Sequence, residues 1–215
     1  MSKEINITIV GLSGQGIVMA ARILASALLS DGNRVIMTDI PAPTHRFAPT
    51  FSHIRCGEEV YSPKIAEGEA DLILAFEPGE GLKFGLEFAR EGGTILLSDR
   101  PVGRVSGPCD QENRRFRPPS VPISVELLRQ AGVESTVLIN AAEILEREHL
   151  RSFCLNMLML GAGVATGIIP VADRTVEMFI QDLSPIDSKD SNLRAFRRGI
   201  KRYQELESLF PILIP

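Results

Sequence analysis

Several features that mark common protein classes are missing from this sequence of 215 residues. It has no run of about 18 apolar residues, which argues against a membrane-spanning helix. Lys3 and Glu4 lead directly into a strand pattern, without the features of a secretory signal. The net charge of −4 and the absence of a basic block argue against nucleic acid as the main partner. We therefore predict a cytoplasmic protein that binds neither membrane nor nucleic acid.

Residue patterns for metal, redox or hydrolytic chemistry are also scarce. Cys56, Cys109 and Cys154 are scattered and form no C-x-x-C pair, so they cannot by themselves ligate an iron–sulfur cluster. The sequence has no H-E-x-x-H motif, no nucleophile elbow, no G-D-G…N diphosphate–metal motif and no convincing acid–base pair. We predict no catalytic residue and no metal ligand, which favours a binding or coupling module.

The informative stretch is at the start of the chain. Residues 5–10 are rich in β-branched side chains and predict a buried strand, and the apolar spacing in residues 17–29 predicts a helix. Between them, Gly11, Gly14 and Gly16 follow the spacing G-x-x-G-x-G, which is neither the dinucleotide fingerprint nor a P-loop. Such a turn lets backbone N–H groups approach a phosphate at a helix amino end. It could equally serve only close packing of strand and helix.

A proline-rich loop is expected near this turn. Three prolines between Ile40 and Thr50 exclude regular structure, and the loop leaves the carboxyl end of a predicted strand, where open α/β sheets bind ligands. His45 and Arg46 could hold a carboxylate or phosphate there, or Arg46 could simply pair with a nearby acid. Asp39 stands where a dinucleotide fold places its ribose-binding acid, but a strand-end Asp is also an ordinary cap.

The remaining pattern predicts an α/β fold: a three-layer Rossmann-like domain with a mostly parallel, mixed sheet that includes one hairpin, and a helical carboxyl-terminal third. We expect a single domain over residues 1–215, with a proline-rich excursion at 101–122. The predicted strands are 34–39, 70–76, 94–99 and 137–140, with a hairpin of 51–56 and 60–63; the predicted helices are 81–90, 125–130, 141–148, 153–167 and 192–210.

Residues 153–167 differ from the other predicted helices because they are apolar almost all round. This indicates a helix buried on every side or covered by a partner. Small residues such as Gly161 and Gly163 would let another element approach closely. Asn156 is the odd polar residue, and we expect it to cap a neighbouring loop rather than to touch a ligand.

Four motifs, in this order, resemble those of the gamma subunit or gamma domain of 2-oxoacid:acceptor oxidoreductases. Within that family the chain looks most like the small subunit of the indolepyruvate:ferredoxin type. The motifs are Gly11-Leu12-Ser13-Gly14-Gln15-Gly16; Val60-Tyr61-Ser62-Pro63 with residues 67–78; Asn156 to Ala162; and Asn192 to Gly199. They span nearly the whole chain, and the excursion at 101–122 matches least.

The resemblance implies a subunit of a thiamine-dependent 2-oxoacid:ferredoxin oxidoreductase. In such complexes a partner subunit holds thiamine diphosphate and magnesium, iron–sulfur clusters pass electrons to ferredoxin, and a 2-oxoacid such as pyruvate or indolepyruvate yields an acyl-coenzyme A. This chain would hold no cofactor alone but would help place coenzyme A. The residues implied for that role are Gly11, Ser13, Gly14, Gln15, Gly16, His45 and Arg46.

Two departures from the family pattern affect this reading. Ser13 replaces a family glycine, and Phe47-Ala48-Pro49 replaces the glycines that often follow the arginine. The main alternative is a stand-alone Rossmann-like nucleotide-binding protein or reductase, with Asp39 on a ribose. A third possibility is a purely structural subunit that binds no small molecule.

Overall fold

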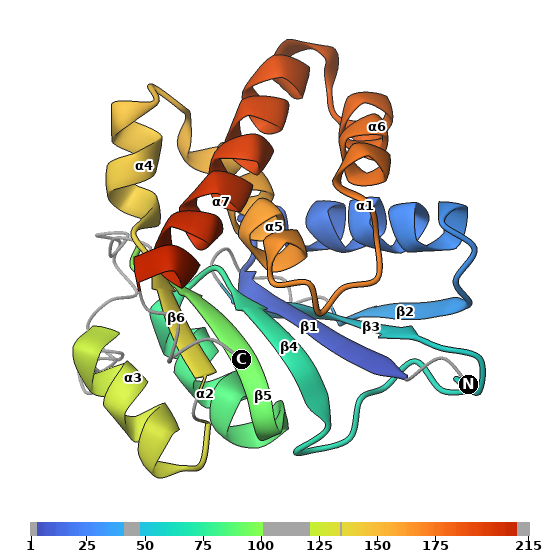
Figure 1. Cartoon of the computed structure of the whole chain (residues 1–215), viewed down its shortest axis with the longest axis vertical. Helices are drawn as coiled ribbons and strands as arrows, with labels where there is room; N and C mark the ends of the chain where they lie inside the picture. Colours follow the sequence, from blue (N-terminus) through green and yellow to red (C-terminus); the bar gives the residue numbers. More distant parts are fainter. Residues whose placement is uncertain (1–3, 41–47, 101–120, 134, 210–215) are drawn as a thin grey trace.

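A six-stranded sheet with helices on both faces forms the core of the computed structural model, which describes residues 4–40, 48–100, 121–133 and 135–209 (Figure 1). The strand order is β2-β3-β1-β4-β5-β6. The strands are β1 Ile5–Leu12, β2 Val35–Ile40, β3 Pro49–Cys56, β4 Ala70–Ala75, β5 Ala89–Ser98 and β6 Ser135–Ile139. The helices are α1 Ile17–Ser30, α2 Pro78–Phe88, α3 Val121–Gln130, α4 Ala141–Arg147, α5 Leu155–Ala165, α6 Asp173–Leu183 and α7 Lys189–Leu209, with 3-10 turns at Ser152–Cys154 and Ile186–Ser188.

The mixed sheet is confirmed, but its hairpin is not the predicted one. β1, β4, β5 and β6 are parallel, whereas β3 pairs antiparallel with both β1 and β2. The hairpin is therefore formed by β2 and β3, and residues 60–63 form no strand. The Arg55 guanidinium donates to the backbone carbonyls of Ser62, at 3.0 Å, and Lys64, at 3.3 Å. These bonds hold the segment after β3 as a loop.

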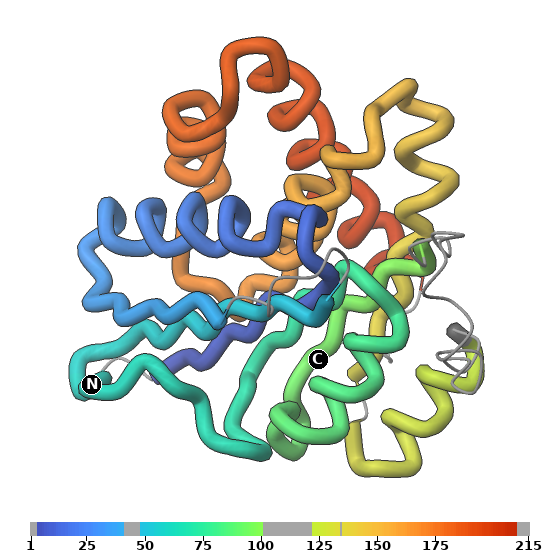
Figure 2. The backbone as a smooth tube through the Cα atoms, turned by 180° about the vertical axis from the view of Figure 1, so that it is seen from behind, coloured from blue at the N-terminus to red at the C-terminus, as the bar shows by residue number. Residues whose placement is uncertain are grey.

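The helices cover the two faces of the sheet and make the predicted three layers. α1 and α5 pack on one face, and α2 and α3 on the other, as Figure 1 and the reverse view in Figure 2 show. Successive side chains of a strand point to opposite faces. Ile9 of β1 and Leu74 of β4 therefore belong to the core under α5, while Val10 and Ile73 belong to the core under α2.

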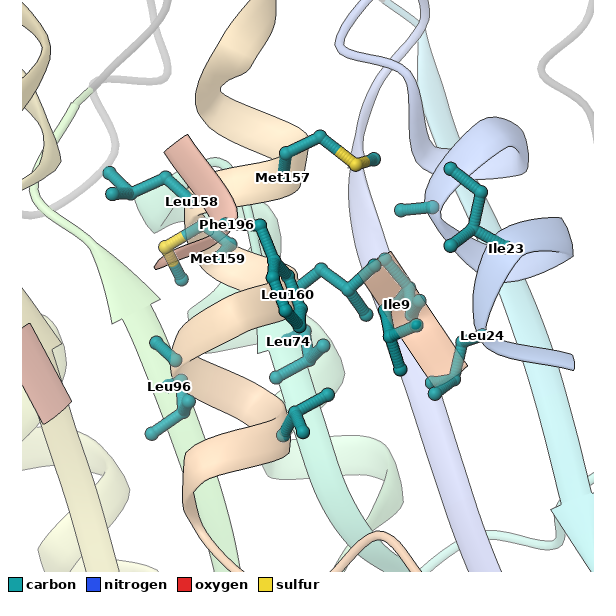
Figure 3. Packing of buried hydrophobic residues seen from close by; sticks show 14 of the residues in the cluster. Ile9, Ile23, Leu24, Leu74, Leu96, Met157, Leu158, Met159, Leu160 and Phe196 are labelled. Atoms are coloured by element: carbon teal, nitrogen blue, oxygen red, sulfur yellow. The ribbon is translucent and has the colours of Figure 1, made fainter. Parts of the chain in front are cut away.

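α5 is the centre of the larger core. Ten of its eleven residues are buried, and it contacts α1, α7, β4 and β5. Figure 3 shows Met157 and Leu160 of this helix among Ile9, Leu74 and Phe196. The prediction of a helix buried on every side is confirmed for residues 155–164, and elements of this chain supply the cover; Phe153, which was predicted to belong to this helix, lies in the preceding 3-10 turn and is 40% exposed.

α5 and α7 cross at two glycines. A β-carbon at Gly161 would collide with the backbone carbonyl of Phe196, and one at Gly199 would collide with the backbone carbonyl of Leu158. Gly163 is also closely packed, because its β-carbon would lie 2.8 Å from the Leu74 side chain. The expectation that small residues allow close approach is confirmed here.

Two element boundaries shift for identifiable reasons. α2 begins at Pro78 rather than at residue 81, because the Glu77 side chain accepts the Glu80 N–H at 2.8 Å and proline suits the first helical position. β5 begins at Ala89, so Gly92 and its neighbours lie in a strand with a shifted register and do not close a helix. Residues 101–120 of the excursion lie outside the described residues, and residues 121–122 already belong to α3.

α6 was not predicted from the sequence, and α7 begins at Lys189, three residues before the predicted start at residue 192. α6 buries only Val176 and Ile180, so its apolar signal is weak. The Arg197 side chain of α7 makes two hydrogen bonds of 2.6 Å to the Glu177 carboxylate of α6, which join the helices. Within the described residues, no helix combines the length and apolar character needed to cross a membrane.

Candidate functional site

Two turns meet at the carboxyl edge of the sheet, between the neighbouring parallel strands β1 and β4. After β1 the chain crosses through α1 to β2 on one side, and after β4 it crosses through α2 to β5 on the other. Open α/β sheets bind ligands at such a reversal of strand order. The Phe76 N–H donates to the Val10 carbonyl at 2.8 Å, which joins the strand ends at this edge. Residues 11–16 and 76–80 therefore form the candidate site.

Gly14 and Gly16 give the first turn a left-handed backbone. Their φ angles are +96° and +78°, a region that favours glycine. A β-carbon at Gly16 would collide with the Asn156 side-chain amide, whereas one at Gly14 would meet no atom within 4 Å. The exposed Gly14 therefore presents its backbone to open space, where a phosphate has room.

Gln15 holds the turn in shape. Its Oε1 accepts the Leu12 N–H at 2.6 Å, and its Nε2 donates to the Phe76 carbonyl at 3.1 Å. A β-carbon at Gly11 would lie 2.5 Å from Gln15 Oε1 and 3.1 Å from Phe76 Cβ, so only glycine leaves room there. Gln15 and Gly11 thus act through the backbone of the turn, a positioning role that sequence reasoning did not separate from ligand contact.

The amino end of α1 has the chemistry of an anion site. Gly16 stands at the N-cap with no side-chain hydrogen bond, and the first helical turn contains no acidic residue. The first N–H groups of a helix lack intrahelical partners and carry partial positive charge. Ser13 fits the turn without strain, because His149 is the one non-glycine residue with positive φ in the described part of the chain.

The Ser13 N–H connects the turn to the strand that follows the proline-rich loop, donating to the Ala48 carbonyl at 2.9 Å. Pro49 opens β3 opposite Leu12, at the first strand position, which tolerates proline. His45 and Arg46 lie outside the described residues, so their placement in the site stays a prediction.

Asn156, at the start of α5, holds the glycine turn through its backbone. It is 4% exposed, its Nδ2 donates to the Gly16 carbonyl at 3.4 Å, and its Oδ1 accepts the Met157 N–H at 2.8 Å. The expectation that Asn156 caps a neighbouring loop is confirmed.

Glu77 and Glu80 are the site residues that sequence reasoning missed. Glu77 is 8% exposed, and burial raises the pKa of its carboxyl. Burial also raises the pKa of Glu80, whose Oε2 is buried without a hydrogen-bond partner in the described chain. The available signal was Glu77-Pro78, a helix-start pattern at a strand end.

Asp39 does not lie beside the glycine turn. β3 separates β2 from β1, so the end of β2 is about two strand spacings, roughly 10 Å, from β1. The Asp39 carboxylate also accepts the Ser52 hydroxyl at 2.6 Å. In a dinucleotide fold the strand with the ribose acid adjoins the first strand. This geometry weighs against the ribose role.

No group of three or more His, Cys, Asp or Glu side chains suited to a metal ion occurs within the described ranges. Cys56 and Cys154 are buried free thiols, and burial raises the pKa of both. A thiol with a raised pKa is a poor nucleophile at neutral pH.

The mixed six-stranded sheet, with helices on both faces and the glycine turn at the reversal of strand order, defines a Rossmann-like α/β domain. The family model for pyruvate ferredoxin/flavodoxin oxidoreductases matches residues 6–202, and the chain belongs to this family. The family resemblance seen in the four motifs is thereby confirmed.

Relatives of this chain are subunits of enzymes of this family. The chain is 30% identical over 207 residues to indolepyruvate oxidoreductase subunit IorB of Thermococcus kodakarensis, covering 96% of this chain and 100% of that one. Its fold matches the gamma subunit of a keto/oxoacid ferredoxin oxidoreductase from Geobacter sulfurreducens, with a TM-score of 0.66, 21% identity and coverage of 95% and 98%.

A third match is to a longer chain. The 2-oxoglutarate:ferredoxin oxidoreductase from Magnetococcus marinus, solved with 2-oxoglutarate, coenzyme A and succinyl-CoA, has a TM-score of 0.69 and 19% identity, over 95% of this chain and 32% of that chain. The relatives are thus subunits of oxidoreductase complexes, as the resemblance implied.

Proposed function

We propose that this chain is the small, gamma-type subunit of a thiamine-dependent 2-oxoacid:ferredoxin oxidoreductase, and that its glycine turn helps to place coenzyme A. Residues 1–215 would act as one domain in the cytoplasm. The observation that carries the proposal is the turn itself: the exposed Gly14 stands over the uncapped amino end of α1, at the point where strand order reverses.

The turn suits the pyrophosphate of coenzyme A. The α1 amino end supplies N–H donors, Gly14 leaves open space, and Gln15 with Asn156 keeps the backbone in place. His45 and Arg46, on the adjoining loop, would add positive charge. Coenzyme A supplies the thiol that accepts the acyl group, and this chain's residues bind and orient its phosphates.

The remaining chemistry belongs to partners in this proposal. A thiamine-binding catalytic subunit would hold thiamine diphosphate and magnesium, and iron–sulfur clusters would pass electrons to ferredoxin. Indolepyruvate is the substrate that the name of the Thermococcus relative suggests. The alternative of a stand-alone nucleotide-binding reductase is weaker, because Asp39 is bonded to Ser52 and lies across β3 from the turn.

The test is the substitution Gly14→Asp in the purified complex. The added carboxylate would stand in open space beside the helix amino end and repel the pyrophosphate. We expect coenzyme A affinity, measured by calorimetry, to fall at least about tenfold, the effect of losing a charge-assisted contact. Coenzyme-A-dependent reduction of a viologen dye by indolepyruvate should fall at subsaturating coenzyme A.

Gly14→Asn is the matched control. It has the same shape and tolerates the left-handed backbone equally well, but it carries no charge. Gly14→Asn should therefore retain most coenzyme A affinity. If Gly14→Asp left that affinity intact but abolished assembly with the partner, the purely structural reading would replace this one. A chain that purified without partners and bound a nicotinamide nucleotide tightly would favour the reductase.

A further inference from the structure

A hollow lies between α4 and α7, and none of its lining residues belongs to the glycine turn. Its volume is about 540 Å³. The segment from the end of β6 through α4 contributes Asn140, Glu143 and Arg147, and α7 contributes Arg198, Arg202 and Glu205. Figure 1 shows α4 beside the later turns of α7. The proposed function does not use this hollow.

Two regularly spaced arginines of α7, Arg198 and Arg202, line the hollow, and Arg194 lies one turn earlier, outside its lining. Arg194, Arg198 and Arg202 recur every four residues, so they lie along one side of the helix. The Arg198 and Arg202 side chains are 23% and 21% exposed, against 74% for Arg147 on α4. The two sheltered guanidinium groups therefore provide positive charge in a site partly screened from water, where it acts most strongly.

The carboxylates of the hollow are already engaged. Three arginines and three glutamates line the hollow, and each carboxylate oxygen has a partner. The pairs are Glu143 with Arg147 at 3.0 Å and Asn140 at 2.6 Å; Glu205 with Arg198 at 3.1 Å and Arg202 at 3.5 Å; and Glu148 with Arg198 at 3.3 Å and Arg194 at 4.0 Å.

One arginine of the hollow has an N–H donor without an acceptor among the described residues. Arg202 contacts Glu205 through Nη1, but its Nε is buried without a hydrogen-bond partner in the described part of the chain. A guanidinium has five N–H donors, and a buried unpaired donor costs free energy. The hollow therefore suits a group rich in acceptor oxygens.

One acceptor is also unmatched. Asn140 Oδ1 is buried without a partner among the described residues, while its Nδ2 donates to Glu143 and so sets the direction of the amide. A ligand that fills the hollow should offer several acceptor oxygens to arginine and one O–H donor to Asn140. A phosphate has both near pH 7, because it keeps a proton; carboxylate and sulfate have no such donor.

We infer that the hollow between α4 and α7 is a phosphate site, in which Arg198 and Arg202 hold the phosphate oxygens and Asn140 accepts its O–H. Glu205 competes with the ligand for the same two arginines. The bound group is inorganic phosphate or the phosphoryl group of a larger ligand; in both, the form that keeps one proton offers the O–H to Asn140.

Calorimetric titration of the full chain with inorganic phosphate, and separately with sulfate at equal ionic strength, tests the inference. We expect phosphate to bind about fivefold more tightly than sulfate, the effect of one net hydrogen bond. Arg202→Gln should weaken phosphate binding at least about tenfold. Asn140→Ala should bring phosphate and sulfate to equal affinity. Arg129→Gln, an exposed arginine of α3, should change nothing.

Glu205→Gln gives a test in the opposite direction. It removes the competing charge, so phosphate should bind several-fold more tightly, and this result stands even if Arg202→Gln fails to fold. Absence of saturable binding, equal affinity for both anions in the unchanged protein, or no effect of Glu205→Gln would overturn the inference. So would phosphate binding that is lost in Gly14→Asp but kept in Arg202→Gln, since the anion would then sit at the glycine turn.

To learn whether inorganic phosphate is itself the ligand, the same titration is run with a phosphate monoester. Tighter binding of the monoester, lost in Arg202→Gln, would support a larger phosphorylated ligand. Equal or weaker binding would support inorganic phosphate.

Discussion

At the scale of single residues, side chains that contact only protein atoms shape the candidate site. Gln15 spans the two turns, and Asn156 bonds the Gly16 carbonyl. Gly14 is the exposed residue of the turn and the one best placed to meet a ligand. Among the residues predicted for coenzyme A, Gln15 therefore holds the turn in shape, whereas Gly14 is exposed to a ligand. Sequence spacing alone could not separate these two roles.

His53 carries a prediction about pH. It is 2% exposed, and its Nδ1 accepts the Ile65 N–H at 3.0 Å. Burial, with the charges of Arg55 and Lys64, lowers its pKa from 6.5 to about 4. Between pH 6.5 and 4 the imidazole of His53 is protonated in the unfolded chain but neutral in the folded chain. As the pH is lowered from 6.5 to 4, the free energy of unfolding should therefore fall by up to about 1.4 kcal/mol per pH unit. Above pH 6.5 this group should have no effect on the free energy of unfolding.

Urea unfolding at several pH values measures this effect. His53→Gln removes the titrating group, so the fall in unfolding free energy between pH 6.5 and 4 should be shallower than in the unchanged protein. Ile186→Ala, which shortens an 85% exposed side chain that does not titrate, should keep the original slope. An unchanged slope in His53→Gln would contradict the prediction.

At the scale of elements, the crossing of α5 over α7 requires glycine. In Gly161→Ala the new methyl group would meet the Phe196 backbone carbonyl, and a backbone cannot rotate away as a side chain can. We expect the unfolding free energy to fall by about 2 kcal/mol, since overpacking outweighs the better helix propensity of alanine.

Lys201→Ala, on the exposed side of α7, is the control and should change stability by about 0.5 kcal/mol or less. Chemical denaturation compares the two variants with the unchanged protein. Equal stability of Gly161→Ala and Lys201→Ala would show that the helices can separate at no cost.

Elements with strong periodicity were predictable, and weak ones were not. Apolar spacing predicts α1 because this helix buries most of one face. It predicts α5 because that helix buries nearly its whole surface. α6 buries two side chains and escaped notice. The pairing of β3 with β1 and β2 was missed because strand partners are chosen across the whole sheet, which local alternation does not encode.

At the scale of the whole molecule, the two cores differ in size. The core around α5 gathers buried residues from β1, β3, β4, β5 and β6 and from most helices, while the core under α2 and α3 is much smaller. Among the described side chains of α3, Ser124 and Leu128 are fully buried. Local opening is easiest where few apolar contacts hold an element.

Hydrogen exchange followed by mass spectrometry should therefore show the slowest amide exchange in α5 and the adjoining strands β1 and β4. Peptides from α3 should exchange orders of magnitude faster, because opening that helix exposes little apolar surface. Protection of α3 equal to that of α5 would mean that the layers open together.

The amino-acid order alone determined the class of fold, the glycine turn, a buried helix within residues 153–167 and membership of an oxidoreductase family, because these depend on local spacing and short motifs. Tertiary structure alone decided that β3 separates Asp39 from the turn, that Glu77 and Glu80 join it, and that Arg198, Arg202 and Asn140 line one hollow. Those relations join residues far apart in the chain, and only the packing of helices on the sheet brings them together.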